Sequence, residues 1–423
     1  MSTKNCTFKL HYGFIIIISI FIQMFLGGAF LQTSGLFVLP VTGALKINQG
    51  TYMMYMTVQY IVMAITATFA PKLLSRFRFG TLNRCGIVIM GLGILLMSIA
   101  KSVFVIYLGG ALIGIGQVAV LFLAPGTLIP RFFKTRVGVM LATAVMGLSI
   151  AGVVMNPVVS GLLSRPTVLG MEAWRGTYVI LGAGFIVLGL LNAIILLRDH
   201  PGPEGRYGED ASNAGDGAAA VLKGVSKANA VKSSSFVWLV IMLFAWNVGC
   251  QIYVYLAPYA GFTPAAAKSS MDLTGFIGSV AMIGSIVGGY LIGGANDKFG
   301  ARGGAAVAGA CGVLACVLML LFQSQAVMIL IGAALFGIFY SIANVQLPAM
   351  VTTLYGERDY GSIYPVAAAF SPWFGAVSSS LWGFLYDATG SYNAMHIAGI
   401  ALTALTAIAC FLAVKASKKL KAV

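Results

Sequence analysis

The sequence predicts an all-α membrane protein with twelve transmembrane helices, and three observations support this prediction. Of the 423 residues, 59% are hydrophobic and 9% are charged, and the mean hydropathy is +0.94. Soluble domains carry about 25% charged residues. The apolar runs are continuous over helical lengths of about 20 residues, unlike the alternating segments of about 10 residues in a membrane β-barrel. Basic residues, finally, are abundant in every second loop and sparse in the others.

The first apolar run is expected to remain in the protein as a spanning helix. It follows Lys4 and Lys9, is longer than the core of a signal peptide, and has no small-residue cleavage pattern. The later runs are bounded by polar or Gly-rich loops. The twelve expected helices cover Gly13 to Leu39, Tyr52 to Leu73, Leu82 to Ala100, Val103 to Ile129, Gly138 to Leu163, Thr177 to Leu197, Phe236 to Tyr259, Leu273 to Gly294, Ala305 to Phe322, Ala326 to Leu354, Ser362 to Tyr386 and Ala394 to Val414.

One long polar segment interrupts the apolar runs after the sixth helix. Residues 199–235 are rich in Gly, Ala, Ser and charge and have no apolar period that could build a buried face. Such a composition predicts a flexible linker. The chain therefore divides into a six-helix bundle at 1–198, a cytoplasmic linker at 199–235 and a second six-helix bundle at 236–423.

The loop charges indicate the orientation of these helices. With the N-terminus in the cytoplasm, 21 of the 26 Lys and Arg residues fall in cytoplasmic segments. The five on the other side are Lys46, Lys101, Arg165, Arg175 and Lys268. This asymmetry predicts that both termini are cytoplasmic. Short loops and the lack of organelle signals favour a bacterial inner (plasma) membrane, and the same asymmetry explains the net charge of +15 without a nucleic-acid partner.

The cysteines and histidines do not indicate a metal or cofactor site. The six cysteines are scattered, and none forms a CxxC motif or a Cys/His cluster. We therefore expect no metal and no cofactor.

Both halves carry a related loop after their second helix. The first reads PKLLSRFRFGTLNR at 71–84 and the second reads GGANDKFGARGG at 293–304. A short turn with glycine and basic residues lets two helix ends approach, because the cations offset the helix C-terminal dipole. The run at 296–300, NDKFG, resembles the loop motif between the second and third helices of the major facilitator superfamily, although the copy at 75–78 lacks the Asp.

A second segment resembles one particular branch of this superfamily. Residues 131–157, RFFKTRVGVMLATAVMGLSIAGVVMNP, are similar to the fourth-loop and fifth-helix pattern of the monocarboxylate and oxalate/formate branch. The resemblance covers essentially the whole chain and implies two pseudo-symmetric six-helix bundles, a solute cavity at their interface and alternating access. It also implies a conformational, gating role for the loop residues Arg76, Arg78, Arg131, Arg136, Asp297 and Lys298.

Ionisable residues within the membrane would be the first candidates for a functional site. Here the eleven acids and the basic residues fall in loops or at helix ends, and among the histidines only His396 falls inside an expected helix, near the outer end of the last one. The resemblance implies basic residues in relatives that move carboxylates, at positions that are Gly289 and Ala367 in this chain. An anion would then be held by neutral donors such as Gln, Asn, Tyr and Trp.

Neutral polar residues on the first, fourth, seventh and tenth helices are the remaining candidates. Amides are costly against lipid, and Asn247 with Gln251, like Tyr340 with Asn344, lies four residues apart on one helix face. The resemblance to oxalate-transporting relatives implies a cage that also includes Tyr364. The expected substrate-binding residues are Gln32, Phe122, Asn247, Gln251, Tyr340, Asn344, Tyr364, Gln23 and Gln117. The alternative for each is a contact that holds helices together.

Two further residues are weaker candidates. Trp373 is one, and Asn156 is the other, although the Asn156-Pro157 pair is better explained as a bend in the fifth helix.

These observations predict a secondary transporter and not an enzyme, since no titratable or metal-binding group is expected inside the membrane. The resemblance implies a small monocarboxylate or related organic anion, whereas the uncharged cavity favours a neutral or largely apolar solute. The lack of an intramembrane acid favours exchange, uniport or a proton that travels with the substrate. A transporter-like receptor is the alternative from another class. The expected partners are the solute and the lipid bilayer, and the expected state is a monomer.

Overall fold

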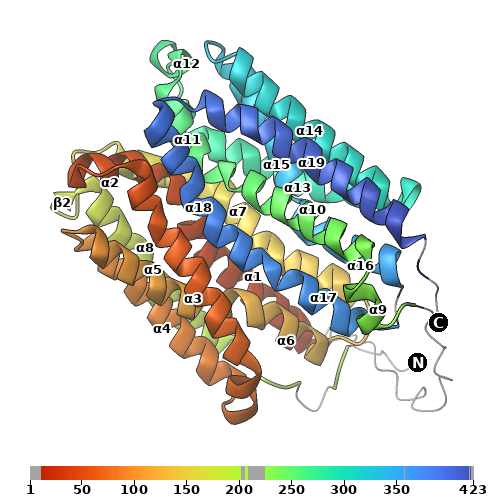
Figure 1. Cartoon of the computed structure of the whole chain (residues 1–423). Coiled ribbons are helices and arrows are strands. Elements are labelled where there is room, and N and C mark those ends of the chain that lie inside the picture. Colours follow the sequence, from red (N-terminus) through yellow and green to blue (C-terminus); the bar gives the residue numbers. More distant parts are fainter. Residues whose placement is uncertain (1–10, 202–204, 208–223, 357, 419, 421–423) are drawn as a thin grey trace, which may run out of the picture.

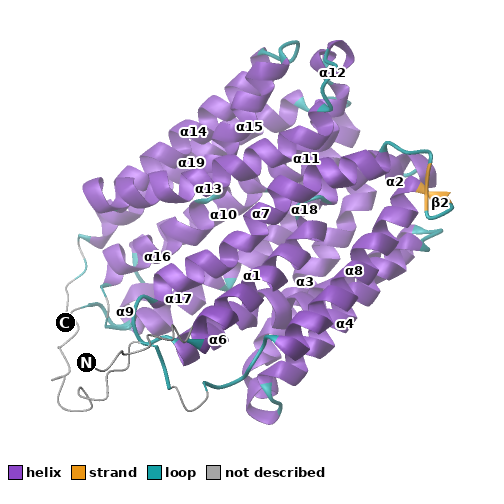
Figure 2. Ribbon diagram, turned by 180° about the vertical axis from the view of Figure 1, so that it is seen from behind, coloured by secondary structure: helices purple, strands orange, loops and turns teal. Residues whose placement is uncertain are grey.

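The computed structural model describes residues 11–201, 205–207, 224–356, 358–418 and 420, without the side chains of 343–345. Helices make up almost all of this part of the chain (Figure 2). The strands β1 (Thr167–Val168) and β2 (Met171–Glu172) form a two-residue antiparallel hairpin. The predicted all-α membrane class is confirmed: ten candidate membrane spans are found within the described residues. The count of twelve stays a prediction, because the expected tenth and eleventh spans are divided into shorter helices.

The first group of helices lies before the linker. Its members are α1 (Tyr12–Leu31), the 3-10 helix η1 (Ser34–Phe37), α2 (Val38–Leu45), α3 (Gln49–Arg76), α4 (Phe79–Ser98), α5 (Val103–Gln117), the π-helix η2 (Val118–Leu123), α6 (Ala124–Phe132), α7 (Val137–Leu163) and α8 (Ala173–Ile195). Within it α1 packs on α7, α3 and α4 pack on α5, and α8 packs on α4.

The second group follows the linker. It consists of α9 (Lys227–Val231), α10 (Ser234–Cys250), α11 (Ile252–Phe262), α12 (Pro264–Lys268), α13 (Leu273–Phe299), α14 (Ala301–Leu321), α15 (Ala326–Tyr340), α16 (Ile342–Tyr355), α17 (Tyr360–Ala368), α18 (Phe370–Thr389) and α19 (Asn393–Ser417). Here α19 packs on α10 and α14, and α15 packs on α13 and α14.

Five expected helices are interrupted, which the sequence prediction missed. The first is broken after Leu31, the fourth contains η2, and the seventh, tenth and eleventh are divided at Gln251, Ser341 and Ala369. A proline lies in the helix that follows four of these interruptions: Pro40 in α2, Pro125 in α6, Pro258 in α11 and Pro348 in α16. Because a proline removes only the hydrogen bond to the carbonyl four residues before it, these prolines lie too far downstream to cause the breaks themselves. The fifth helix, in contrast, runs unbroken through Pro157 as α7.

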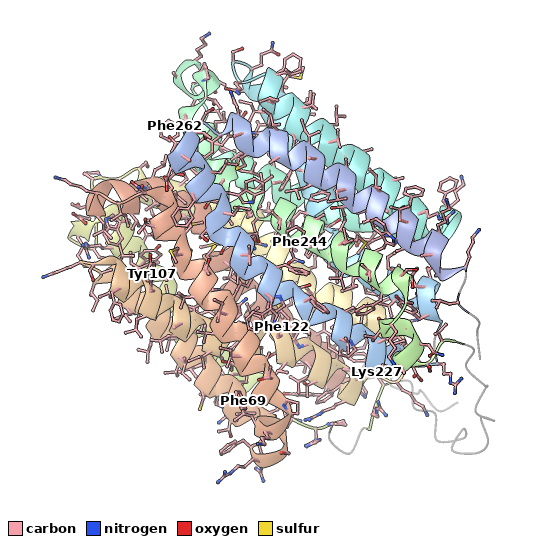
Figure 3. All side chains as sticks on the ribbon, viewed as in Figure 1. Phe69, Tyr107, Phe122, Lys227, Phe244 and Phe262 are labelled. Carbon is pink, nitrogen blue, oxygen red and sulfur yellow. The ribbon has the colours of Figure 1, made fainter. Side chains whose placement is uncertain are left out.

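The two ends of the molecule differ in their elements. We call the end with β1–β2, α2 and α12 the hairpin end, and the end with α6, α9 and the turn between α16 and α17 the linker end (Figure 1). In Figure 3, Phe262 marks the hairpin end and Lys227 marks the linker end.

The expected flexible linker is partly ordered. Residues 202–204 and 208–223 of this segment lie outside the described residues, but Tyr207 forms a bridge to Phe133 in the first group and Gly224 forms one to Gly356 in the second. The last part of the segment is helical, because α9 begins at Lys227 and α10 begins at Ser234. The linker at 199–235 stays a prediction, and its last part contains a short helix and the start of α10.

The two groups meet through three pairs of elements: α3 with α18, α7 with α13, and η1 with α11. The hydrogen bonds that join described residues of the two groups lie in the halves of these helices nearer the hairpin end. On α3 they involve residues 49–60, on α7 residues 153–160, on α13 residues 272–279 and on α18 residues 376–387. Residues 245–260 of α10 and α11 are all buried in this contact region.

Candidate functional site

Three of the expected site residues lie together where the helices are interrupted. Gln32 follows α1, Gln251 separates α10 from α11, and Tyr340 ends α15. The Tyr253 hydroxyl donates to the Gln32 carbonyl oxygen at 2.9 Å, and the Tyr253 and Tyr340 rings are 5.3 Å apart. The Gln251 amide nitrogen donates to the Tyr60 hydroxyl at 2.9 Å. We define the central cluster as Gln32, Tyr60, Cys250, Gln251, Tyr253 and Tyr340.

Further contacts connect the central cluster to both groups of helices. The Asn156 amide nitrogen, on α7, lies 3.3 Å from the Tyr253 hydroxyl and donates to it. Tyr340 is buried near Tyr60, Cys250 and the side chain of Gln32. Helices α1, α3 and α7 of the first group thus converge with α10, α11 and α15 of the second. Interrupted helices that meet near the midplane are the usual place of a solute site in membrane transporters.

Buried polar atoms near the central cluster have no hydrogen-bond partner among the described residues. Two are donors, the side-chain Nε2 of Gln32 and the Nε1 of Trp246. The others are the hydroxyl of Tyr55 and the Oε1 of Gln59. Trp246 lies four residues before Cys250, so both occupy one face of α10. Each unpaired buried group costs about 1 to 3 kcal/mol, and a polar ligand at this position would recover that cost.

Two other expected residues lie inside the first group. The Gln23 amide nitrogen donates to the Asn83 side-chain oxygen at 2.5 Å, which joins α1 to α4. Gln117 accepts from the Gln59 amide at 2.7 Å, which joins α5 to α3. Both amides therefore hold neighbouring helices together. Gln59 precedes Tyr60, so Gln117 reaches the central cluster only through α3.

The rest of the expected set is spread along the second group and η2. The Asn247 amide donates to the Leu243 carbonyl at 2.8 Å and lies 3.5 Å from the Ser371 hydroxyl. Tyr364 stacks on Tyr360 near the linker end, with ring centroids 5.5 Å apart. Phe122 is 56% exposed on η2. The side chain of Asn344 lies outside the described residues.

The weaker candidates are placed differently from one another. Asn156 contacts the central cluster, whereas Trp373 is 49% exposed on α18. His396 is fully buried in α19, its Nδ1 is 2.9 Å from the Tyr392 carbonyl oxygen, and its ring packs on Tyr259 at 4.5 Å. These contacts indicate that His396 packs inside the second group of helices.

At the hairpin end two carboxylates join the groups. Asp387 of α18 accepts the backbone N–H groups of Gln49 and Gly50, at 3.1 and 2.8 Å, and so caps the N-terminus of α3. Asp272 caps its own helix α13 through the N–H of Gly275 and also accepts the hydroxyl of Ser160 on α7 at 2.6 Å. The tyrosine hydroxyl of Tyr392 donates to the Gln49 side chain at 2.9 Å.

The residues expected to act in gating lie at the linker end. Arg76 ends α3, Arg78 precedes α4, and Arg131 donates to the Asp199 carbonyl oxygen at 3.2 Å. Arg136 adopts a left-handed backbone conformation, with φ at 54°, just before α7. Asp297 and Lys298 occupy the last turn of α13, where Lys298 lies over the Phe299 ring.

The sequence analysis missed Tyr60, Cys250 and Tyr253, which complete the central cluster. Cys250 could have been found from its position next to Gln251, which was already an expected site residue. Tyr60 and Tyr253 carried no such signal, since a tyrosine in an apolar helix has the same local pattern whether it packs inside one bundle or across two. In the described part of the chain no group of three or more His, Cys, Asp or Glu residues could hold a metal ion.

Comparisons with known proteins agree with this architecture. The sequence profile of the Major Facilitator Superfamily matches residues 13–271 and 260–422. Monocarboxylate transporter 12 of Rattus norvegicus is 25% identical over 345 residues, which cover 74% of this chain and 68% of that protein.

Solved structures add a likeness in fold. The crystal structure of the nucleoside transporter NupG has a TM-score of 0.69 at 12% identity and covers 97% of this chain and 100% of that one. A bacterial homologue of the human lysosomal transporter Spinster, in an inward-facing and unoccupied conformation, has a TM-score of 0.67 at 14% identity and covers 96% of this chain and 97% of that one.

Proposed function

Because the chain belongs to the Major Facilitator Superfamily and is a multi-pass membrane transporter, we propose that it moves a small monocarboxylate or related organic anion by alternating access. The solute occupies the central cluster. The observation that carries this proposal is the convergence of Gln32, Gln251 and Tyr340, each at an interruption of a different helix, with side chains from both groups. The similarity to monocarboxylate transporter 12 supports this substrate class.

Neutral donors hold the carboxylate in this proposal. The Gln32 and Trp246 side chains each present a buried N–H group with no partner among the described residues, and two N–H donors can satisfy the two oxygens of a carboxylate. The rings of Tyr253 and Tyr340 form an apolar wall beside them. The binding energy then comes from hydrogen bonds and apolar contact without an ion pair.

A neutral or largely apolar organic solute is the second candidate. It is favoured by the uncharged nature of every described partner of the central cluster. The two positions at which carboxylate-transporting relatives are expected to carry cations are Gly289, which has open space around it, and Ala367, which is fully buried. A transporter-like receptor is a more distant alternative, because nothing in the described residues favours it over transport.

The direction of opening follows from the same geometry. The two groups are joined at the hairpin end, so a solute enters or leaves the central cluster from the linker end in this conformation. Loop charge supports a cytoplasmic linker end, and the likeness to a structure described as inward-facing supports the same orientation. Transport then requires the contacts at the hairpin end to break while Arg76, Arg78, Arg131, Arg136, Asp297 and Lys298 close the linker end.

The rest of the proposal concerns organisation and coupling. Residues 1–198 and 236–423 move as two bundles joined by 199–235, in a monomer in the inner (plasma) membrane with both termini in the cytoplasm. Coupling is exchange, uniport or symport in which the proton travels with the solute. Counterflow that is independent of pH, without accumulation driven by a proton gradient, would count against proton symport.

Solute binding to the purified protein tests the substrate class first. Thermal stability is measured across pH with C1 to C6 mono- and dicarboxylates and with neutral organic solutes, and hits are then followed by counterflow in proteoliposomes. Stabilisation by a monocarboxylate is the expected result. Stabilisation by neutral solutes alone would replace the first candidate with the second, and the absence of any counterflow would overturn transport.

Gln32→Leu tests the site itself. The substitution removes one of the two buried N–H donors that hold the carboxylate in this proposal, and loss of one such hydrogen bond of about 1.4 kcal/mol corresponds to an affinity about tenfold weaker. The matched control is Asn192→Leu, because Asn192 is also a buried amide but bonds to the Ser19 carbonyl oxygen within the first group. Asn192→Leu is expected to lower the melting temperature without changing solute affinity. Equal affinity losses in both variants would contradict a site at the central cluster.

A further inference from the structure

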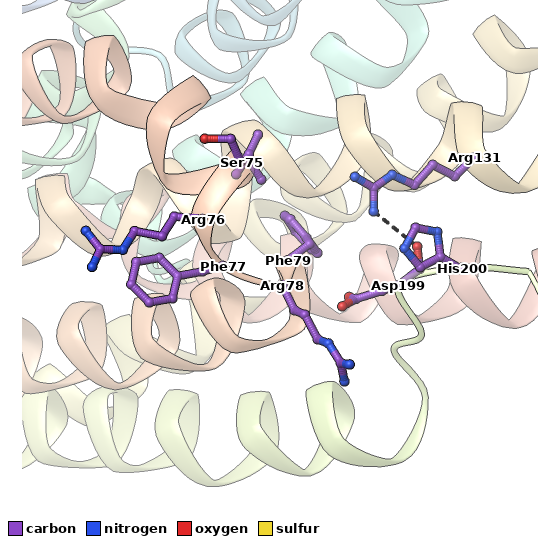
Figure 4. A pocket seen from close by; sticks show the side chains of 9 residues that line it. Ser75, Arg76, Phe77, Arg78, Phe79, Arg131, Asp199 and His200 are labelled. Carbon is purple, nitrogen blue, oxygen red and sulfur yellow. Dashed lines mark hydrogen bonds between the residues drawn. The ribbon is translucent and has the colours of Figure 1, made fainter.

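A cavity lies at the linker end, away from the central cluster. It has a volume of about 500 Å³ and is formed by the turn between α3 and α4, by Arg131 of α6 and by Asp199 and His200 (Figure 4). Its lining residues are Leu74, Ser75, Arg76, Phe77, Arg78, Phe79, Arg131, Asp199 and His200. All of them belong to the first group or to the start of the linker, so the cavity does not depend on contact between the groups.

The cavity is cationic. Arg76 and Arg78 come from the turn, and Arg131 comes from the last turn of α6 on the other side of Asp199. The carboxylate of Asp199, the one acid in the lining, is already engaged, because it accepts the N–H of Gly80 at 2.8 Å and caps α4. Arg131 is held in place by the Asp199 carbonyl oxygen. Two formal positive charges therefore remain in excess at neutral pH.

Apolar side chains are exposed beside these arginines. Phe77, in the turn itself, is 47% exposed, and Phe69, two turns earlier on α3, is 54% exposed (Figure 3). The turn joins the ends of two candidate membrane spans, α3 and α4. It therefore lies at the level of the membrane interface, where a phospholipid places its phosphate next to the beginning of its acyl chains.

We propose that this cavity binds the phosphate group of an anionic phospholipid. Guanidinium groups match phosphate oxygens in pairs, so Arg78 and Arg131, which lie on either side of Asp199, hold the headgroup (Figure 4). Arg76 points away from them and lies over the Phe77 ring, where it adds positive charge at the rim, and the acyl chains pass along Phe77 and Phe69. A water-soluble phosphate offers the same oxygens but leaves the two phenylalanines without a partner. A phospholipid therefore explains both the arginines and the exposed phenylalanines of this surface.

Lipid binding to the full-length protein tests the proposal. The protein is purified in detergent and titrated with phosphatidylglycerol, with phosphatidylcholine, or with glycerol 3-phosphate as the soluble arm, and bound molecules are counted by native mass spectrometry. The variant is Arg76→Gln with Arg78→Gln, because both residues lie on the surface turn and leave the Arg131 hydrogen bond intact. Lys415→Gln, an exposed residue in the last turn of α19 at the same end, controls for general loss of charge.

Phosphatidylglycerol is expected to bind in preference to phosphatidylcholine, and the double variant is expected to weaken it about 30-fold, since each charged contact at the cavity contributes about fivefold. Lys415→Gln is expected to change it by less than about threefold, because Lys415 does not line the cavity and acts only through a screened charge. Binding of glycerol 3-phosphate as tight as that of the lipid would overturn the lipid as the source. An equal loss in Lys415→Gln, or no loss in the double variant that melts at the wild-type temperature, would overturn the site.

Discussion

The hairpin end and the linker end are built from the same twelve expected helices but are held in different ways. At the hairpin end backbone touches backbone: a Cβ on Gly35 would come within 2.0 Å of the Val254 carbonyl oxygen, and one on Gly383 would come within 2.7 Å of Gly50. At the linker end the two groups are joined by the linker, through the bridges at Tyr207 and Gly224. Close glycine contacts at one end and a tether at the other indicate that the hairpin end is the closed gate of this conformation.

The contacts at the hairpin end have to form and break in each transport cycle. Contacts that break in each transport cycle have to be specific but weak, and helix caps fit that requirement because each contributes about 0.5 to 2 kcal/mol. Asp387 caps α3 across the group interface, whereas Asp272 caps its own helix and accepts the Ser160 hydroxyl across that interface. No such pair of capping carboxylates bridges the groups among the described residues of the linker end. The polar bridges of the hairpin end are thus individually weak, and opening this end also separates apolar residues of one buried cluster that both groups share, such as Phe37 and Tyr255.

Gly35→Val is the substitution expected to have the largest effect on the closure of the hairpin end. The added side chain would collide with the Val254 carbonyl in the closed hairpin end and meet no such contact once η1 and α11 separate. Overpacking of this kind costs about 1 to 3 kcal/mol, so the ratio of closed to open hairpin ends is expected to fall by roughly 5-fold to 150-fold, and solute counterflow is expected to fall with it.

Distances between spin labels measure this shift. One pair of labels replaces Lys101 and Lys268 at the hairpin end, and another replaces Thr81 and Lys415 at the linker end; all four positions are exposed. Gly35→Val is expected to lengthen the first distance and shorten the second. Gly43→Ala is the control, because a Cβ at Gly43 meets nothing within 4 Å. An unchanged distribution in Gly35→Val would mean that η1 and α11 do not form the gate.

The sequence predicted the fold more completely than it predicted the residues of the candidate site. Helix existence follows from the length of apolar runs, which a single chain displays directly, so the membrane class was confirmed. The interruptions were not predicted, because a break of one or two residues leaves the apolar run continuous in the sequence. The central cluster depends on which faces of Tyr60 and Tyr253 meet across two groups. That information resides in tertiary packing, so the cluster could be predicted only in part, through Gln32, Gln251 and Tyr340.

Asp387→Asn is expected to have an intermediate effect. The variant keeps one acceptor for the N–H groups of Gln49 and Gly50 but loses the charge that interacts with the N-terminal dipole of α3. Because Asp387 is exposed, about 1 kcal/mol is expected, or about a fivefold loss of the closed population. Asp359→Asn is a matched control, since that carboxylate accepts the N–H of Lys227 at the linker end without joining the two groups. The same label distances would refute the prediction if both variants shifted them equally.

Ser160→Ala is expected to have the smallest effect of the three and tests whether the two carboxylates are equivalent. Only the 2.6 Å hydrogen bond from the Ser160 hydroxyl joins Asp272 to the first group, because the other oxygen of Asp272 caps its own helix. Loss of one exposed hydrogen bond of about 0.5 kcal/mol corresponds to about a twofold loss of the closed population. Ser164→Ala, whose hydroxyl bonds only within its own turn, is the control. If Ser160→Ala opened the hairpin end more than Asp387→Asn did, the contact between α7 and α13, and not the cap on α3, would be the main lock of this end.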